Sequence, residues 1–478
     1  MDSIDIDWML AQPGHAAAQQ GARISFSDGR IAGTSGIAAP GNGLLAMPAL
    51  ADAHDHGRGL RPLSFGATDL PLELWLPQLG LEPRVDPYLR AAVAFGRMAV
   101  SGVAAANHCH NPQNHDRIVE EAEAVSRAAR DIGIRVGFAV PVMDRNEVVY
   151  GDPGPLISAL GKERFDTVEA RLKRPPTEVQ VARVEEIAAF EHERFHVQYG
   201  PFAPHWCKDK TLAAIAQASA DTGRRMHMHL LETERQRQWA DAAYPGGLVR
   251  HLDAIGLLSE RLTVAHGVWL RPDEMELLAA RDVTVSINTS SNLRLRSGIA
   301  PLAQMRAAGL AWAVGLDGMA FDDDEDALRE LRLVWHVQQS SSFSPSLDVA
   351  NLFDAVCRRG WWTVTNRDEG GRIEPDAAAD MIVLDYAAMT GDAVTDGLDP
   401  LAIVLTRACR RHIDTLIVGG QPIVAGKQLI SADLPALEAR LREEARAAFA
   451  GLPEPDDEFT RLLDALADYY SRSCHCYV

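Results

Sequence analysis

Histidines and carboxylates recur at several points of the chain where a strand is expected to end. His54 and His56 stand two residues apart, directly after the apolar segment Leu44–Ala53. Residues i and i+2 of a strand project to the same face, so both imidazoles would point the same way. Neutral imidazole nitrogens suit borderline metals such as zinc. The pair therefore predicts part of a metal site, with a chance His-x-His turn as the alternative.

A second cluster lies in the segment that runs from His227 to Glu232. His229 would stand at a strand end, with Glu232 in the loop just beyond it. An imidazole there can bind a metal, and a carboxyl group one step away can carry a proton. His227 has the same orientation but would lie one layer deeper, where a hydrogen-bonded interior histidine is the favoured interpretation.

Two further groups complete the pattern. His266 precedes Gly267 and Asp317 precedes Gly318, each at the end of an apolar segment. Asp317 could bind a metal or accept a proton from water, although Asp-Gly is also a common turn. Independent accidents would rarely fall on four separate strand ends, so the combination predicts a metal-dependent catalytic site.

Short apolar segments alternate with longer amphipathic ones, a pattern typical of a parallel sheet covered by helices. Eight such units predict an α/β fold, a (β/α)8 TIM-like barrel, whose active sites lie at the carboxyl ends of the strands. The expected strands are Leu44–His56, Val103–Asn107, Arg135–Val142, Phe195–Tyr199, Arg225–Leu231, Leu262–His266, Val283–Asn288 and Leu310–Asp317.

Four regions are expected along the chain. Residues 1–46 and 366–430 carry short strands and tight turns, and together they would form a small β-sandwich domain built from both chain ends. Residues 47–365 form the metal-dependent hydrolase barrel. Residues 431–478 form a helical extension, whose Cys474-His475-Cys476 tail is interpreted as frayed chain, with metal binding as the alternative.

Composition excludes several classes of protein. The formal net charge of −19 would repel nucleic acids and anionic membranes, so neither is an expected partner. No apolar run approaches the ~18 residues of a membrane span, and the acidic start does not look like a secretory signal. The six cysteines have no framework spacing. A cytoplasmic enzyme with a small-molecule substrate is expected.

The ordered set of motifs resembles the amidohydrolase superfamily, specifically the deaminase-like branch that includes cytosine, guanine and S-adenosylhomocysteine deaminases and triazine hydrolases. Three segments outside the ligand motifs also look like that branch, namely Asp69–Leu76, Asn288–Asn292 and Asp380–Asp385. The resemblance covers about residues 30 to 430 and also implies a homo-oligomer, either a dimer or a tetramer.

The resemblance implies a role for each motif residue. His54, His56, His229 and Asp317 would bind one divalent metal ion, with Zn²⁺ expected and Fe²⁺ or Mn²⁺ as alternatives. Glu232, His266 and Asp317 would be catalytic. Two-metal members bridge their ions with a carboxylated lysine on the fourth strand, but Phe195–Tyr199 contains no lysine. The chain is therefore expected to hold one ion.

The expected reaction is deamination of a nitrogen heterocycle such as a purine, pyrimidine, pterin or s-triazine. Hydrolysis of an amide, urea or carbon–halogen bond is the alternative at the same site. An inactive metal-binding scaffold is disfavoured because every motif residue is present. The branch often has histidine where this chain has Phe202, which argues against an adenosine-type substrate. Candidate substrate contacts are Trp75, Asn107, His108, His205 and Trp206.

Overall fold

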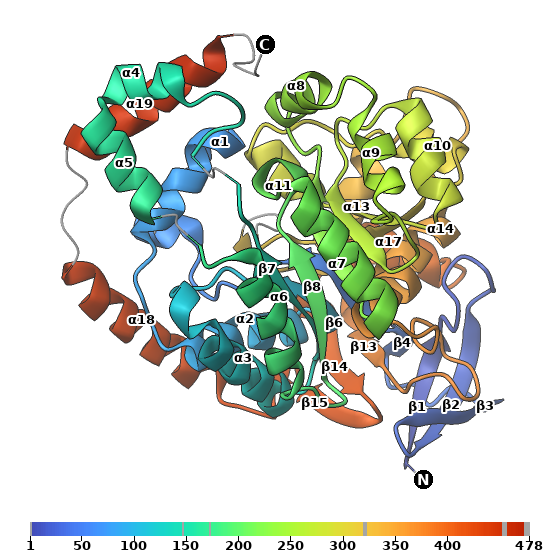
Figure 1. Ribbon diagram of the computed structural model, residues 1–478. Coiled ribbons are helices and arrows are strands. Elements are labelled where there is room, and N and C mark those ends of the chain that lie inside the picture. The colour runs from blue at the N-terminus through green and yellow to red at the C-terminus, as the bar shows by residue number, and fades with distance from the viewer. Residues whose placement is uncertain (1, 146–147, 172–173, 319–322, 452–456, 473–478) are drawn as a thin grey trace.

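The computed structural model describes residues 2–145, 148–171, 174–318, 323–451 and 457–472. The Cys474-His475-Cys476 tail lies outside these ranges. Within them, every helix is too short or too polar to cross a lipid bilayer. The chain forms a barrel of strands and helices, a second sheet at one side and two C-terminal helices along its flank (Figure 1).

Eight strands pair in parallel and in sequence order, which confirms the TIM-like barrel. The sheet closes where the Asp317 N–H donates to the His54 carbonyl oxygen at 2.8 Å, joining the end of the last strand to the first. The strands are β5 (Leu50–Asp55), β6 (Val103–Cys109), β7 (Arg135–Val142), β8 (Phe195–Pro201), β9 (Met226–Leu230), β10 (Leu262–His266), β11 (Thr284–Ile287) and β12 (Ala311–Val314).

Helices cover the outside of the barrel, as the amphipathic segments predict. The first begins at Pro87, where the side chain of Asp86 accepts a hydrogen bond from the Leu89 N–H, and such caps favour helix initiation. The covering helices are α2 (Pro87–Val100), α3 (Ile118–Ile132), α6 (Thr177–Ala188), α7 (Asp209–Thr222), α8 (Glu234–Ala243), α9 (Leu248–Ala254), α10 (Pro272–Ala280), α12 (Leu302–Ala307) and α13 (Ala327–Val337). The short α11 (Thr289–Arg294) lies at the barrel mouth instead, where Ser291 contacts Asp317.

A second eight-stranded sheet draws its strands from both chain ends, as expected. Its β1 runs parallel to β4, and its other neighbours are antiparallel. In sheet order the strands are β16 (Gln428–Leu429), β15 (Gln421–Ala425), β14 (Ile413–Val418), β13 (Met381–Asp385), β4 (Leu44–Pro48), β1 (Asp2–Met9), β2 (Gln19–Ser27) and β3 (Arg30–Gly36).

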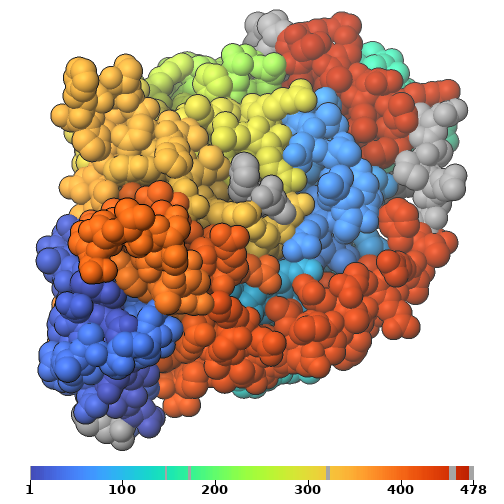
Figure 2. Space-filling view, turned by 180° about the vertical axis from the view of Figure 1, so that it is seen from behind, coloured from blue at the N-terminus to red at the C-terminus, as the bar shows by residue number. Residues whose placement is uncertain are grey.

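The apolar segment that leads to the first histidine pair is two strands and not one. β4 belongs to the end-built sheet, whereas β5 opens the barrel, and Ala49 separates them. Both strands are buried, so hydrophobicity alone gives no sign of the break. Figure 2 shows the N-terminal strands against the C-terminal segments that complete their sheet.

Several helices follow the barrel strands. The chain passes through α14 (Val349–Asp354) and α15 (Gly360–Thr365), and α15 packs against β5, β6 and β7. Two helices, α16 (Tyr386–Thr390) and α17 (Pro400–Arg407), lie between strands of the second sheet. The final pair is α18 (Leu434–Ala450) and α19 (Asp457–Ser471).

The C-terminal extension forms the two expected helices, which reach different parts of the barrel. α18 packs on α2, where the Arg97 Nε–H donates to Glu438 at 2.7 Å. α19 packs on α4 (Gly154–Leu160) and α1 (Leu72–Trp75), beside α5 (Lys162–Arg171) (Figure 1). α4 and α5 lie in the long connection between β7 and α6. α19, α1 and this connection, which are distant in the sequence, therefore pack together.

Candidate metal centre and active-site cleft

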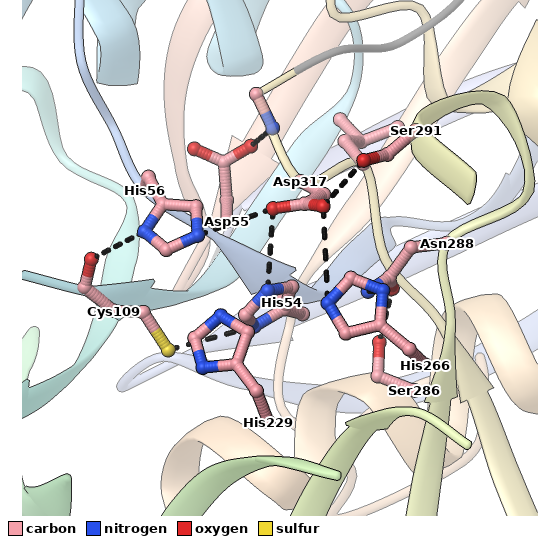
Figure 3. Close-up of polar contacts among 12 residues, drawn as sticks. His54, Asp55, His56, Cys109, His229, His266, Ser286, Asn288, Ser291 and Asp317 are labelled. Atoms are coloured by element: carbon pink, nitrogen blue, oxygen red, sulfur yellow. Dashed lines mark hydrogen bonds and ion pairs between the residues drawn. The ribbon is translucent and has the colours of Figure 1, made fainter. Parts of the chain in front are cut away.

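The predicted metal ligands converge at the carboxyl ends of the barrel strands (Figure 3). His54 Nε2 and His56 Nε2 each lie 3.2 Å from Asp317 Oδ1. His54, His56 and His229 offer nitrogen atoms within 4.8 Å of one another. Residues from three separate strands therefore surround one point, and all four side chains are buried.

The backbone turns sharply where these side chains enter the cleft. Leu231, His266 and Asp317 have φ angles of 49°, 74° and 58°. This left-handed region is costly for residues other than glycine and is often retained at functional sites. Gly267 and Gly318 continue the same turn at low cost. These turns direct the side chains of His266, Asp317 and Glu232, which follows Leu231, into the barrel mouth.

Each ligand imidazole is fixed through the nitrogen that faces away from the centre. The His56 Nδ1–H donates to the Cys109 carbonyl at 2.9 Å, and the His229 Nδ1–H donates to the Phe202 carbonyl at 2.8 Å. His54 Nδ1 lies 2.8 Å from His227 Nε2, so His227 is the expected interior hydrogen-bonded histidine. These contacts direct the Nε2 lone pairs toward the centre, as metal-binding histidines require.

The donor atoms at the centre fit a divalent metal ion. His54 Nε2 is buried and has no hydrogen-bond partner within the described chain. Burial lowers the pKa of His54 and of His229, and it lowers that of His56 to about 4, which favours the neutral imidazole form that binds a metal ion. Three neutral imidazoles and one carboxylate form a donor set that is typical of zinc.

Asp317 is held ionised. Burial alone would raise the pKa of this carboxyl group, but the nearby imidazoles of His54, His56 and His266 outweigh it and lower the pKa well below its usual value. The Ser291 hydroxyl also donates to Asp317 Oδ2 at 2.6 Å. The second oxygen therefore has a fixed orientation and can accept a proton.

Glu232 lies on the other side of His266 and has the opposite protonation preference. His266 Nε2 is 3.6 Å from Glu232 Oε2 and 4.0 Å from Asp317 Oδ2. Burial raises the pKa of Glu232 to about 7, while the Ser297 hydroxyl donates to its Oε1 at 3.1 Å. His266 Nδ1 is 2.8 Å from Asn292 Oδ1, which orients the ring. The cleft thus contains one ionised carboxyl group, Asp317, and one, Glu232, that is about half protonated at pH 7.

A cleft opens above this centre. Three of the five predicted substrate contacts, Trp75, His205 and Trp206, line it. Asn107 does not, because β6 continues past it and leaves it beneath the mouth. His108 does not either, because it points to the opposite, helix-covered side of β6, where its ring lies 5.8 Å from the Phe95 ring of α2. Asn107 donates to the Ala53 carbonyl and to Thr363 Oγ1, and His108 Nε2 lies 3.0 Å from His110 Nδ1. Asn107 therefore supports the barrel interior, whereas His108 packs between the barrel and its covering helices.

The C-terminal helix supports one wall of the cleft. The Tyr150 N–H donates to the Tyr470 hydroxyl of α19 at 3.2 Å, and the two rings lie 5.4 Å apart. Tyr150 in turn packs on His205, with ring centroids 4.4 Å apart. A residue near the end of the chain therefore positions a cleft residue through one intermediate side chain.

Sequence reasoning missed other cleft residues, including Arg58, Asn111 and Gln236. Arg58 could have been found, because it continues the alternation of His54 and His56 by one more step. Asn111 and Gln236 offer no such signal, since each lies in a loop or helix whose approach to the cleft depends on the fold.

Comparisons with known proteins agree with this architecture. The amidohydrolase family matches residues 45–423, and the chain belongs to that family. It is 27% identical over 449 residues to a 5'-deoxyadenosine deaminase from Methanothermobacter thermautotrophicus, covering 90% of this chain and 94% of the relative. It is 25% identical over 451 residues to a 5-methylthioadenosine/S-adenosylhomocysteine deaminase from Pelotomaculum thermopropionicum, covering 93% and 94%.

Solved structures share the fold. An adenosine deaminase from Xanthomonas campestris with bound zinc aligns with a TM-score of 0.76 at 21% identity, covering 94% of this chain and 98% of the other. The family match and the deaminase relatives confirm the expected resemblance to deaminase-like amidohydrolases. They also confirm the expectation that the protein is a hydrolase acting on carbon–nitrogen bonds.

Proposed function

We propose that this protein is a metal-dependent aminohydrolase that releases ammonia from an amino-substituted nitrogen heterocycle. The observation that carries the proposal is the pair of carboxyl groups that flank His266, with the pKa of Asp317 well below its usual value and that of Glu232 raised to about 7. Two carboxyl groups whose environments separate their pKa values are suited to act as base and acid in one reaction. The deaminase relatives support the same chemistry.

His54, His56, His229 and Asp317 would hold the ion. A divalent ion there would act as a Lewis acid that lowers the pKa of water toward ~7. The neutral imidazoles and the single carboxylate leave a net positive charge at the centre when the ion is bound, which favours an anionic oxygen. Zinc fits this donor set best.

The protein's own groups would move two protons. Asp317 accepts a proton from water as the water oxygen forms a bond to the amino-bearing carbon. Glu232 donates its proton to the adjacent ring nitrogen, which receives the electron pair of the C=N bond. The C–N bond to the amino group then breaks, ammonia leaves with the proton that Asp317 accepted, and the proton left on the attacking oxygen passes to Glu232. The product is a ring carbonyl, and both carboxyl groups return to their starting states. His266, whose Nε2 lies between the two carboxyl groups, orients the attacking water oxygen by a hydrogen bond.

A substrate panel with the zinc-reconstituted enzyme tests the proposal. The panel contains 5'-deoxyadenosine, 5'-methylthioadenosine, S-adenosylhomocysteine, cytosine, guanine, pterin and a chloro-s-triazine, with ammonia and chloride measured separately. We expect ammonia from at least one amino heterocycle, and none from the Asp317→Asn variant. Chloride without ammonia, or no product from any compound, would contradict the proposal.

A further inference from the structure

Arg58 is a buried cation in the wall of the cleft. It follows His56 by two residues, is only 7% exposed, and lines the same cleft as His56 and Asp317. Its guanidinium lies over the Trp75 ring, 5.5 Å from the ring centroid. The proposed reaction gives this residue no role.

The protein provides Arg58 with little compensation for burial. Its one direct hydrogen bond is from Nη2 to Asn111 Oδ1 at 3.2 Å, and its Nε is buried with no partner in the described chain. Within those residues, no carboxylate lies at ion-pair distance from the guanidinium. A buried charge without a counter-charge is costly, and stacking on an aromatic ring compensates for only part of that cost.

The acidic groups nearest to Arg58 are bound to other partners. Glu82 accepts two hydrogen bonds from Arg90, at 2.9 and 3.2 Å. Asp55 accepts from the backbone N–H groups of Gly57 and Gly318. Asp317 belongs to the metal centre. The guanidinium is thus left with free N–H donors on a surface that a substrate would touch.

Other donors in the cleft also lack partners. The indole nitrogens of Trp75 and Trp206 are buried without a hydrogen-bond acceptor in the described chain. An indole N–H can only donate. The rest of this wall is apolar, with Leu72, Leu76 and Leu295. Arg58 thus presents a cationic donor beside an apolar and aromatic wall, which suits a flat ring that carries an oxygen acceptor at its edge.

We propose that Arg58, oriented by Asn111, binds an oxygen anion or carbonyl oxygen of the substrate, so that the enzyme prefers an oxygen-bearing, typically acidic heterocycle over its uncharged counterpart. This inference rests on the proposed aminohydrolase function for the identity of the site. A carboxylate is the best partner, because its two oxygens match two parallel N–H donors of a guanidinium. A ring carbonyl would engage one or two of the same donors.

Three matched pairs of probes test this site in the zinc-reconstituted, full-length enzyme. They are 5'-deoxyadenosine and adenosine-5'-carboxylate, pterin and pterin-6-carboxylate, and 2-aminopurine and guanine. The first two pairs add a carboxylate and the third adds a ring carbonyl. Isothermal titration measures the Kd of each probe, and ammonia release measures kcat/KM.

We expect the wild type to bind the oxygen-bearing member of at least one pair about tenfold to a hundredfold more tightly. Arg58→Gln should abolish that preference, and Arg58→Lys should keep part of it because the charge remains without the planar fork. Arg61→Gln removes the same charge three residues further along, outside the cleft lining, and should keep the preference. Metal content and thermal unfolding are measured for every variant.

The outcomes separate this site from the proposed function. Probes that bind through Arg58 without ammonia release would contradict the aminohydrolase and leave the oxygen site standing. Ammonia released equally well by wild type and Arg58→Gln, with equal Kd values, would overturn the oxygen site and leave the aminohydrolase standing. Absence of any preference in all three pairs would also overturn it.

Discussion

Replacing Glu232 by glutamine removes the proposed acid while keeping the shape of the side chain. Glutamine retains an oxygen that can accept from the Ser297 hydroxyl, which now donates to Glu232 at 3.1 Å. It cannot donate a proton as an acid. We therefore expect Glu232→Gln to fold and to hold its metal, and to lose turnover.

The size of the effect follows from the protonation of Glu232. Burial raises the pKa of this group from its ordinary value of 4.5 to about 7, and the neighbouring charges of Asp317 and Glu73 add to the rise. At pH 7 about half of the enzyme therefore carries the proton, compared with about 0.3% at the ordinary value. Positioned acids and bases contribute roughly 10²- to 10⁴-fold to rates, so kcat should fall by that factor.

The same pKa predicts the pH dependence. The proton-bearing form of Glu232 predominates below pH about 7 and is lost above it. Wild-type kcat should therefore decline as pH rises through about 7, and this decline should be absent from the residual activity of Glu232→Gln. Steady-state ammonia release from about pH 5.5 to about pH 9 measures both.

A matched control is the same change at Glu73, a neighbouring buried carboxyl that accepts from the Thr233 hydroxyl at 2.5 Å and lies outside the cleft lining. Glu73→Gln should keep kcat within the same order of magnitude. Wild-type turnover in Glu232→Gln, or an unchanged alkaline decline in that variant, would refute the reasoning.

Three other predictions address metal binding, stability and the cleft wall. His54→Ala should lose bound metal by elemental analysis, and stoichiometric metal would remove this residue from the ligand set. Burial raises the pKa of Glu330 from 4.5 to about 7, so its ionised form is disfavoured in the fold. Glu330→Gln should therefore raise the free energy of unfolding by up to about 3 kcal/mol above pH 7 and by little near pH 4.5, and an equal gain at both would contradict this origin. Tyr470→Ala removes the support that reaches His205 through Tyr150, so KM should rise with kcat of the same order. An unchanged KM would show that α19 does not shape the cleft.

The strand-end positions of the candidate ligands could be predicted because side-chain alternation and barrel geometry are local and regular. His54, His56, His229 and Asp317 each stand where a parallel strand ends, and the fold brings such ends together. The same logic misplaced Asn107 and His108, because β6 extends to Cys109, which leaves Asn107 below the mouth and turns His108 toward the covering helices. Strand length, which tertiary pairing decides, is not encoded in the residue pattern itself.

Features that depend on contacts between distant segments could not be predicted from the residue pattern. The apolar segment before His54 divides between two sheets at Ala49, and both halves are largely buried. α19 was expected as a helix, but its contact with Tyr150 joins segments 320 residues apart. The isolation of the Arg58 charge depends on where each neighbouring carboxylate finds its own partner. Such properties emerge only when the whole chain is packed.

The central claim is that three imidazoles and one aspartate bind a single ion. Anomalous X-ray diffraction from crystals of the zinc-loaded protein, collected on both sides of the zinc edge, tests it directly. The account predicts one anomalous peak at this centre, about 2.0–2.2 Å from His54, His56, His229 and Asp317. No peak there, a second peak beside it, or an ion bound elsewhere with these four side chains free would contradict it.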